Sequence, residues 1–338
     1  TPPPGSAPPP GRSPGGVDAV TVYGFHASHE QFAPGVLLDA LRAAERAGFG
    51  AGMCSDHLAP WNTRQGHSGH AWTWLGAALQ ATDLSLGVVT SPGTRYHPVV
   101  LAQAMGTLGE MFPGRHWAAL GSGEALNERV TGDPWPPKDE RNSRLEFSVE
   151  VMRALFAGET VHAEDGPWPV REARLWTHPD PVPELYTAAV TPATATRSAR
   201  WADGLITINQ PGHAQRETLA AYREAGGRGP AVLQVHLSWD PDPDRALAVA
   251  HDQWREALLG SDVAWEIAQP EHFEQAARFV GPDQVAQYVH SSADPGEHAA
   301  WLVEAAEGFD RVMLHQVGAD QVGFVETFGE RVLPEVTG

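Results

Sequence analysis

The sequence has very little cysteine and lysine. Its 338 residues contain one cysteine, Cys54, which excludes an intramolecular disulfide and a cysteine-based metal cluster. Lysine also occurs once, at Lys138, so arginine supplies nearly all of the positive charge. No apolar run approaches the roughly 18 residues that a membrane-spanning helix needs. We therefore expect a protein that folds on its hydrophobic core and does not enter a membrane.

Positive charge is scarce overall. The chain has 42 Asp and Glu against 23 Lys and Arg, which gives a formal net charge of -19. Nucleic acids and anionic membranes are bound by basic surfaces, so neither is expected as a partner. We expect a small-molecule substrate and a cytoplasmic location. An export signal upstream of Thr1 is left open.

The composition predicts a disordered tail over residues 1–17 and one barrel domain over residues 18–338. The tail begins TPPPGSAPPPGRSPGG, which cannot bury apolar surface. The remainder is long enough for an α/β barrel of roughly 250 residues with insertions. With 42% hydrophobic residues in the chain, it can bury a large core.

Short apolar runs alternate with helical patterns from Val20 onward, and this order predicts a (β/α)8 TIM barrel. Eight runs have the pattern of strands, at 20–26, 50–55, 84–90, 115–121, 184–189, 203–208, 231–239 and 311–316. The clearest helical patterns lie at 35–48, 72–82, 98–111 and 141–157. Eight such units fit a closed barrel better than an open sheet. Residues 159–183 interrupt the alternation as an insertion, and 259–294 add a further helical region.

Polar side chains follow most of the predicted strands, where a barrel of this kind places its active site. They are His26, Ser28, His29 and Glu30 after the first strand, Asp56, His57 and Trp61 after the second, Thr90, Ser91 and Arg95 after the third, Ser122, Glu124 and Asn127 after the fourth, Asn209 and Gln210 after the sixth, and His315 near the end of the eighth. So many His, Asp, Glu and Trp residues on one rim indicate an active site rather than a solvated face.

Two motifs carry a specific resemblance. They are Asp56-His57-Leu58-Ala59-Pro60-Trp61 and Gly121-Ser122-Gly123-Glu124-Ala125-Leu126-Asn127-Glu128. Through them the sequence resembles the luciferase-like superfamily of flavin and deazaflavin oxidoreductases, in a branch similar to the glucose-6-phosphate dehydrogenases that use coenzyme F420. A sub-branch of FMN-dependent oxidoreductases is more similar still, through the segments FHASHEQ and TGDPWPPK. The resemblance extends from Val20 to Pro334.

The resemblance implies a hydride transfer between a substrate carbon and the cofactor. By position, His57 would take the substrate hydroxyl proton, Glu124 would exchange a proton, and Trp61 would flank the reacting carbon. The chemistry agrees, because histidine titrates near neutrality and a carboxyl group in an apolar pocket can act as an acid. The cofactor-binding positions implied are Asp56, Val89, Ser91, Ser122, Gly123, Asn127, Val190, Thr191, Ala193 and Thr194. A homodimer and a non-prolyl cis peptide near Val88-Val89 are also implied.

Departures from the resembling sugar-phosphate enzymes concern the substrate. The two lysines and one arginine that hold the phosphate in those enzymes match Pro211, Ala264 and Tyr288 here. Each charge-assisted contact is worth ~1.5–3 kcal/mol, so their loss should abolish phosphate recognition. We therefore expect a neutral or apolar alcohol or carbonyl substrate. The pocket residues expected are His26, His67, Trp72, Asn209, Pro211, Ala264 and Tyr288.

The cofactor is predicted to be FMN or coenzyme F420. A Gly-Gly-Pro segment of the deazaflavin enzymes is replaced by Val190-Thr191-Pro192. Backbone N–H groups of the following helix can still hold a phosphate, with Thr194 and Arg197 nearby. The longer acidic tail of F420 would meet a strongly acidic protein, which favours FMN slightly.

Three other functions are compatible with the same residues. A reduced FMN could react with oxygen, which would make the protein a luciferase-like monooxygenase. A metal-dependent barrel hydrolase would use His26, His29, His57, His67 and a carboxylate. A protein that binds the cofactor without turnover is the third alternative, because barrels host many chemistries.

Overall fold

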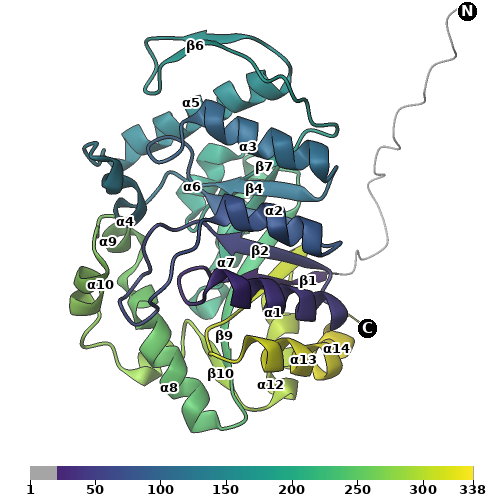
Figure 1. Ribbon diagram of the computed structural model, residues 1–338. Coiled ribbons are helices and arrows are strands. Elements are labelled where there is room, and N and C mark those ends of the chain that lie inside the picture. The colour runs from purple at the N-terminus through teal and green to yellow at the C-terminus, as the bar shows by residue number, and fades with distance from the viewer. Residues whose placement is uncertain (1–20, 338) are drawn as a thin grey trace, which may run out of the picture.

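A closed barrel of eight parallel strands forms the centre of the computed structural model, which describes residues 21–337 (Figure 1). The barrel strands are β1 (Val22–Ala27), β2 (Ala51–Ser55), β3 (Ser85–Thr90), β4 (His116–Leu120), β7 (Glu184–Ala188), β8 (Gly204–Ile208), β9 (Ala231–Trp239) and β11 (Arg311–Gln316). Parallel pairing of β8 with β9 closes the circle. The predicted TIM barrel is confirmed, while the tail predicted over 1–17 lies outside the described residues.

Helices follow the strands and cover the outside of the barrel (Figure 1). They are α1 (Pro34–Arg46), α2 (Ala71–Ala81), α3 (Pro98–Met111), α5 (Lys138–Phe156), α6 (Pro192–Ser198), α7 (Gln215–Glu224), α8 (Pro243–Trp254), α12 (Pro295–Ala305), α13 (Gln321–Arg331) and α14 (Leu333–Val336). Proline stands in the first turn of α1, α3, α6, α8 and α12, where its missing N–H costs nothing. The side chains of Thr191, Asp242 and Asp294 cap three of these helices, because each oxygen accepts a free backbone N–H.

Large aromatic side chains fill the inside of the barrel. Trp117 on β4 stacks on Tyr186 on β7 with ring centroids 4.9 Å apart. Gly87 on β3 makes room for the indole, since a Cβ atom at that position would lie 2.1 Å from Trp117. Trp117 is the second residue of β4 and Tyr186 the third residue of β7, so neither lies at the carboxyl end of its strand. These side chains therefore fill the barrel interior on the amino-terminal side, which leaves the carboxyl ends of the strands as the place where a ligand can enter.

Two insertions depart from the regular alternation. Residues 159–183 contain the antiparallel hairpin of β5 (Val161–Ala163) and β6 (Val170–Ala173), which lies at the top of Figure 1. The region 259–294 contains α9 (Ser261–Ala264), α10 (Pro270–Ala276) and α11 (Pro282–Val285) as expected, and also the strand β10 (His290–Ser292). β10 pairs with residues 237–239 at the end of β9, whereas β8 pairs with residues 231–234 at its beginning.

Short helical segments complete the loops at the carboxyl ends of the strands. They are α4 (Ala125–Glu128) and the 3-10 turns η1 (Arg129–Thr131), η2 (Pro211–His213) and η3 (Arg255–Leu259). The cis peptide recorded in residues 21–337 is Asp180-Pro181, so the expected cis bond near Val88-Val89 is wrong.

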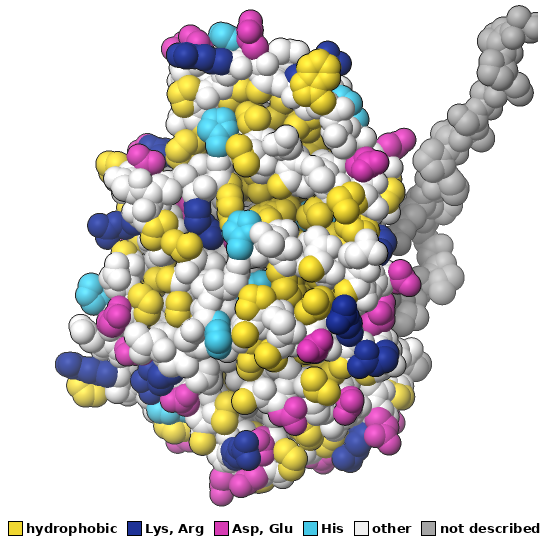
Figure 2. Space-filling view, in the orientation of Figure 1, with side chains coloured by type: hydrophobic (Ala, Val, Ile, Leu, Met, Phe, Trp, Pro, Cys, Tyr) yellow, Lys and Arg dark blue, Asp and Glu magenta, His cyan; other side chains and the backbone are white. Residues whose placement is uncertain are grey.

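The surface mixes charged and apolar side chains. Figure 2 shows hydrophobic side chains gathered over the part of the face where α2 and α3 lie, with acidic and basic groups more frequent below them. On α3, the side chains of Val100 and Met111 are more than half exposed. No helix in the described part of the chain is long and apolar enough to cross a membrane.

Candidate active site

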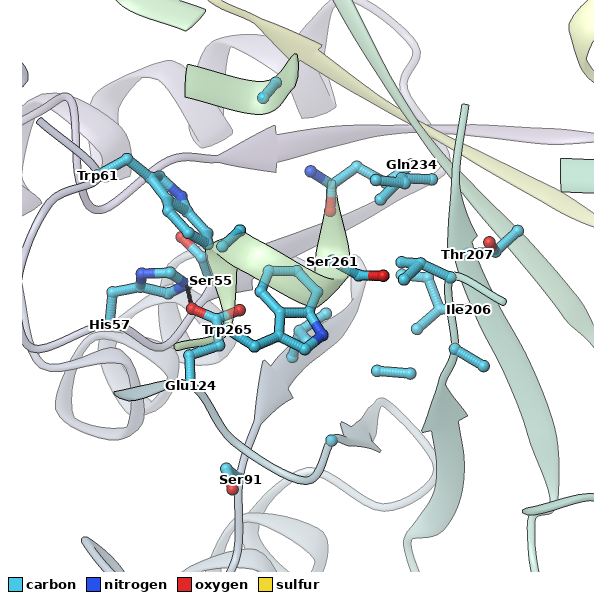
Figure 3. Close-up of a pocket in the computed structure, with 18 of the residues that line it drawn as sticks. Ser55, His57, Trp61, Ser91, Glu124, Ile206, Thr207, Gln234, Ser261 and Trp265 are labelled. Atoms are coloured by element: carbon cyan, nitrogen blue, oxygen red, sulfur yellow. Dashed lines mark ion pairs between the residues drawn. The ribbon is translucent and has the colours of Figure 1, made fainter. Parts of the chain in front are cut away.

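The carboxyl ends of the strands open into one cavity of about 520 Å³ (Figure 3). Most of the predicted site residues line it. These are His26, Asp56, His57, Trp61, Val89, Ser91, Ser122, Gly123, Glu124, Asn127, Val190, Thr191, Thr194, Asn209, Pro211, Ala264 and Tyr288. The fold therefore brings together residues that are more than 250 positions apart in the chain.

His57 lies between two carboxyl groups. Its Nε2 atom is 3.5 Å from Oε1 of Glu30 and 3.9 Å from Oε2 of Glu124. Figure 3 shows the His57 ring and the Glu124 carboxyl group pointing toward one another. The Trp61 ring packs 4.9 Å from the imidazole, and Phe273 meets that indole edge-on. The imidazole is thus held between an aromatic wall and two proton-exchanging groups.

Glu30 lines the cavity beside His57, although the sequence analysis gave it no role. It follows β1, and its Oε2 accepts hydrogen bonds from the hydroxyls of Ser28 at 2.9 Å and Ser55 at 2.7 Å. Burial acts to raise the pKa of Glu30, but the facing His57 and the Ser55 hydroxyl outweigh it, so the pKa is lowered. Glu30 is therefore an ionised carboxylate that can stabilise a protonated His57.

The pKa of Glu124 is shifted in the opposite direction. Glu124 occupies the position before α4, and burial raises its pKa, with a further contribution from the charge of Glu30. The attraction of His57 only partly offsets these effects. Two carboxyl groups whose pKa values are shifted in opposite directions around one imidazole form an acid and base pair of the kind found in active sites.

Asp56 directly precedes His57, but its carboxylate forms hydrogen bonds with other side chains of the protein. Oδ2 accepts a hydrogen bond from Thr90 at 2.6 Å, and Oδ1 accepts one from the hydroxyl of Tyr96 at 3.0 Å. Arg95 donates to Oδ1 of Asp56 and also lies beside Glu128. Asp56 therefore anchors the loops after β2 and β3 beneath the cavity.

Three histidines form the floor of the cavity. His26 on β1 and His236 on β9 flank His315 on β11, with ring centroids 4.5 Å and 5.1 Å from it, and Trp254 meets His315 edge-on at 4.5 Å. Burial lowers the pKa of His26 to about 4, that of His236 to about 3, and that of His315 well below its usual value. The floor is uncharged at neutral pH. His236 was missed because the run Val235-His236-Leu237 has the apolar pattern of a buried strand.

Three predicted residues do not line the cavity. His67 is exposed, and its backbone N–H donates to the carbonyl of Glu30. Trp72 lies on the buried face of α2 and packs edge-on against His116. Ala193 is on the exposed side of α6. The way α2 and α6 pack on the barrel turns Trp72 and Ala193 away from the cavity. The position of a residue near the rim does not reveal this orientation.

Metal chemistry finds no support in residues 21–337, which hold no cluster of three His, Cys, Asp or Glu side chains arranged for a metal ion. Two of the four histidines named for that alternative, His29 and His67, do not line the cavity. His29 bonds through Nδ1 to the carbonyl of Gly69 at 2.9 Å, and His67 lies outside the cavity.

The cavity also offers groups suited to a flat, phosphorylated cofactor. Gly123 has a φ of 83°, and a Cβ there would lie 3.0 Å from Oγ of Ser91, so only glycine leaves the backbone open to a ring. Thr191 and Thr194 supply hydroxyls at the start of α6. Arg197 is not available, because it forms an ion pair with Glu146 at 2.7 Å.

The fold, the cavity and the groups around His57 are those of a barrel enzyme that transfers protons, and comparison with known proteins identifies it as an oxidoreductase. Residues 16–311 match the model of the luciferase-like monooxygenase family. The chain belongs to this family, as the resemblance implied.

Relatives with stated activities lie within the family. The F420-dependent glucose-6-phosphate dehydrogenase of Beutenbergia cavernae is 37% identical over 326 residues, which cover 93% of this chain and 96% of that protein. The enzyme of the same name from Mycobacterium tuberculosis H37Rv is 33% identical, with 93% and 97% covered.

Solved structures agree with these relatives. The F420-dependent secondary alcohol dehydrogenase in complex with an F420-acetone adduct superposes with a TM-score of 0.87 and 29% identity, over 94% of this chain and 100% of that one. The monooxygenase RslO1 from Streptomyces bottropensis, with a TM-score of 0.67, 21% identity, and 93% of this chain and 99% of that chain covered, shares the fold. The slight preference for FMN drawn from the net charge is not supported, since the similar dehydrogenases are named for F420.

Proposed function

We propose that the protein is an F420-dependent dehydrogenase that interconverts a neutral secondary alcohol and its carbonyl form. The observation that carries the proposal is the position of His57 between an ionised Glu30 and a Glu124 with a raised pKa, on the wall of a cavity at the strand ends. The F420 named for the similar dehydrogenases supports the cofactor.

The residues of the cavity fit this cofactor. The open backbone at Gly123 can approach a tricyclic ring, and the hydroxyls of Ser91, Ser122 and Thr191 surround it. The Oγ1 atom of Thr207 is buried on the same cavity wall without a hydrogen-bond partner in the described residues. When bound, F420 supplies the hydride acceptor.

Proton transfer falls to the residues around His57. As the carbinol carbon loses a hydride, its hydroxyl gives a proton to Nε2 of His57, which leaves a carbonyl product. The carboxylate of Glu30 then stabilises the imidazolium that forms, 3.5 Å away. Glu124 is the group that can donate a proton on the same side, because burial favours its protonated form. Trp61 and Trp265 form the wall beside these groups (Figure 3).

The charge of the cavity supports a neutral substrate. Pro211, Ala264 and Tyr288 all line the wall and carry no positive charge. Arg95 is paired with Asp56 and Glu128. None of these three positions offers a cation, so a phosphate bound beside them near His57 would meet the carboxylate of Glu30, which is unfavourable in a buried site.

Equilibrium binding of F420 and FMN to the purified protein, followed by fluorescence quenching, tests the cofactor. We expect tight binding of F420 and weaker binding of FMN. Turnover of secondary alcohols and of glucose 6-phosphate by the F420-loaded protein then tests the substrate class. Binding of FMN alone would favour the monooxygenase alternative, and binding of neither would refute the cofactor site. Rapid turnover of glucose 6-phosphate at micromolar KM would refute the neutral substrate.

A further inference from the structure

His26 is a buried polar residue on the cavity wall without a hydrogen-bond partner. It lies near the end of β1, is 3% exposed, and lines the same cavity as His57 and Glu124. Its Nδ1 atom is fully buried and unpartnered, whereas Nε2 is not among the fully buried atoms and forms no hydrogen bond within the part of the chain that the structure describes. Nε2 is therefore the nitrogen that a ligand in the cavity can reach, and pairing it there would be favoured, because an unpaired buried polar group costs ~1–3 kcal/mol.

The neighbouring imidazoles are already oriented by the protein. Nε2 of His315 lies 2.8 Å from the side-chain oxygen of Gln31, to which it donates. Nδ1 of His236 lies 3.2 Å from the side-chain oxygen of Asn209, whose nitrogen donates to the carbonyl of Tyr288. Both rings are therefore fixed in one tautomer. His26 packs on His315 with no such bond, so its proton can take either nitrogen.

Neutrality limits what His26 can bind. Burial lowers its pKa to about 4, so at neutral pH the ring offers one donor or one acceptor and no charge. The indole of Trp254 and the uncharged His236 continue the same floor. These surroundings suit an uncharged carbon skeleton with an oxygen atom directed at His26.

We propose that His26 hydrogen-bonds an oxygen of the substrate other than the one that reacts at His57, so that the substrate is a neutral alcohol with a second hydroxyl or carbonyl group. The inference rests on the proposed dehydrogenase function. A site that hydrogen-bonds a substrate hydroxyl discriminates strongly against analogues that lack it, because its own polar group is then left unpaired. His26 thus determines specificity, while His57 carries the proton.

Matched ring alcohols test the proposal, with cyclohexanol compared to 1,2-, 1,3- and 1,4-cyclohexanediol in the F420-loaded protein. We expect at least one diol to exceed cyclohexanol in kcat/KM by about tenfold or more. His26→Phe should lower the ratio of kcat/KM for the diol to kcat/KM for cyclohexanol toward one, mainly by raising KM for the diol, and His26→Gln should restore part of that ratio. His298→Phe is the control, because His298 is also buried with an unpartnered Nδ1 but packs against Phe328 outside the cavity.

A binding measurement separates this inference from the proposed function. The imidazole Cε1–H resonance of His26, assigned by its loss in His26→Phe, should shift when a cyclohexanediol is added to the cofactor-free protein and not when cyclohexanol is added. Absence of turnover with F420 bound, together with that shift, would overturn the dehydrogenase and leave His26 as a hydroxyl-binding residue. Equal kcat/KM for all four alcohols, or equal responses of the resonance, would overturn the role of His26.

Discussion

The side-chain oxygen of Asn127 lies 2.8 Å from the backbone nitrogen of Leu58. The same oxygen accepts a weaker bond from Ala59 at 3.4 Å, and the amide nitrogen lies 3.4 Å from Oε2 of Glu124. One amide therefore joins the loop that carries His57 to the helix turn that carries Glu124. Asn127 was predicted to bind the cofactor, and its observed contacts show that it also holds the His57 loop and Glu124 together.

Replacing Asn127 should disturb that arrangement. Asn127→Ala leaves two backbone N–H groups without an acceptor, which should cost about 1–3 kcal/mol of stability. We expect kcat to fall about tenfold or more, because misplacement of His57 affects the transition state more than binding. Asn127→Asp keeps the acceptor and should retain most of the stability. Thermal unfolding and steady-state kinetics measure both, and an unchanged kcat in Asn127→Ala would contradict the positioning role.

Removal of the proposed proton-transfer groups should act on turnover alone. His57→Ala and Glu124→Gln should each lower kcat by ~10²–10⁴. The affinity for F420, measured by fluorescence, should stay within a few-fold of the wild-type value, because the groups proposed to hold the cofactor are the Gly123 backbone and the hydroxyls of Ser91, Ser122 and Thr191 rather than these two side chains. Unchanged kcat in both variants would show that the chemistry occurs elsewhere.

Glu128 should make the stability depend on pH. Burial raises its pKa to about 7, although Arg95 opposes the shift. A raised carboxyl pKa means that the folded state holds the proton more tightly, so the contribution of Glu128 to stability is fully present below about pH 4.5 and is lost as the pH rises through about 7. Glu128→Gln should therefore gain stability relative to the wild type between pH 5 and pH 8, by about 1–3 kcal/mol. Thermal unfolding of both proteins at pH 5 and pH 8 measures this gain. A stability difference between Glu128→Gln and the wild type that does not change with pH would contradict the prediction.

Lys138 should contribute to cofactor affinity. It begins α5 and lines the cavity with Asn142 and Thr194, and no ion pair to it is formed within residues 21–337. A single partly exposed charge pair is worth ~0.2–1 kcal/mol, so Lys138→Gln should weaken F420 binding by about two- to fivefold and reduce its salt dependence. Lys138→Arg keeps the charge and serves as the control. Equal affinities for all three proteins would show that the lysine does not meet the acidic tail of the cofactor.

The homodimer implied by the family resemblance stays a prediction. The exposed Val100 and Met111 on α3 belong to the more apolar part of the surface in Figure 2. We expect light scattering to give twice the 36.3 kDa of one chain, and Val100→Glu to shift the mass toward a monomer. A wild-type monomer at micromolar concentration would refute the prediction.

Barrel and site differ in how far the sequence determines them. The runs at 231–239 and 311–316 and the helix at 98–111 have the observed bounds of β9, β11 and α3, because period and flanking turns suffice for such elements. β10 was missed, since three residues, His290 to Ser292, carry no period. Its pairing depends on the free end of β9.

The chemistry of the site needs contacts that no local pattern contains. Glu30 follows a strand as Glu124 does, yet their pKa values move in opposite directions. His57 lowers the pKa of both groups, but the hydroxyl of Ser55, which β2 brings to Glu30 from 25 positions away, lowers that of Glu30 further. The preference for FMN failed for a related reason. Net charge is a property of the whole chain, whereas the cavity wall holds Lys138.

β9 pairs with β8 on one side and β11 on the other, so the barrel is closed without the segment between α8 and α12. That segment supplies Ala264, Trp265 and Tyr288 to the cavity, while His57 and Glu124 come from the first half of the chain. Apart from His26 and Pro211, these wall residues proposed to contact the substrate are thus encoded in a stretch separate from the proton-transfer groups. Grafting residues 255–292 of a relative onto this chain should exchange substrate preference while the machinery for proton transfer stays in place, which makes the segment a natural unit for recombination.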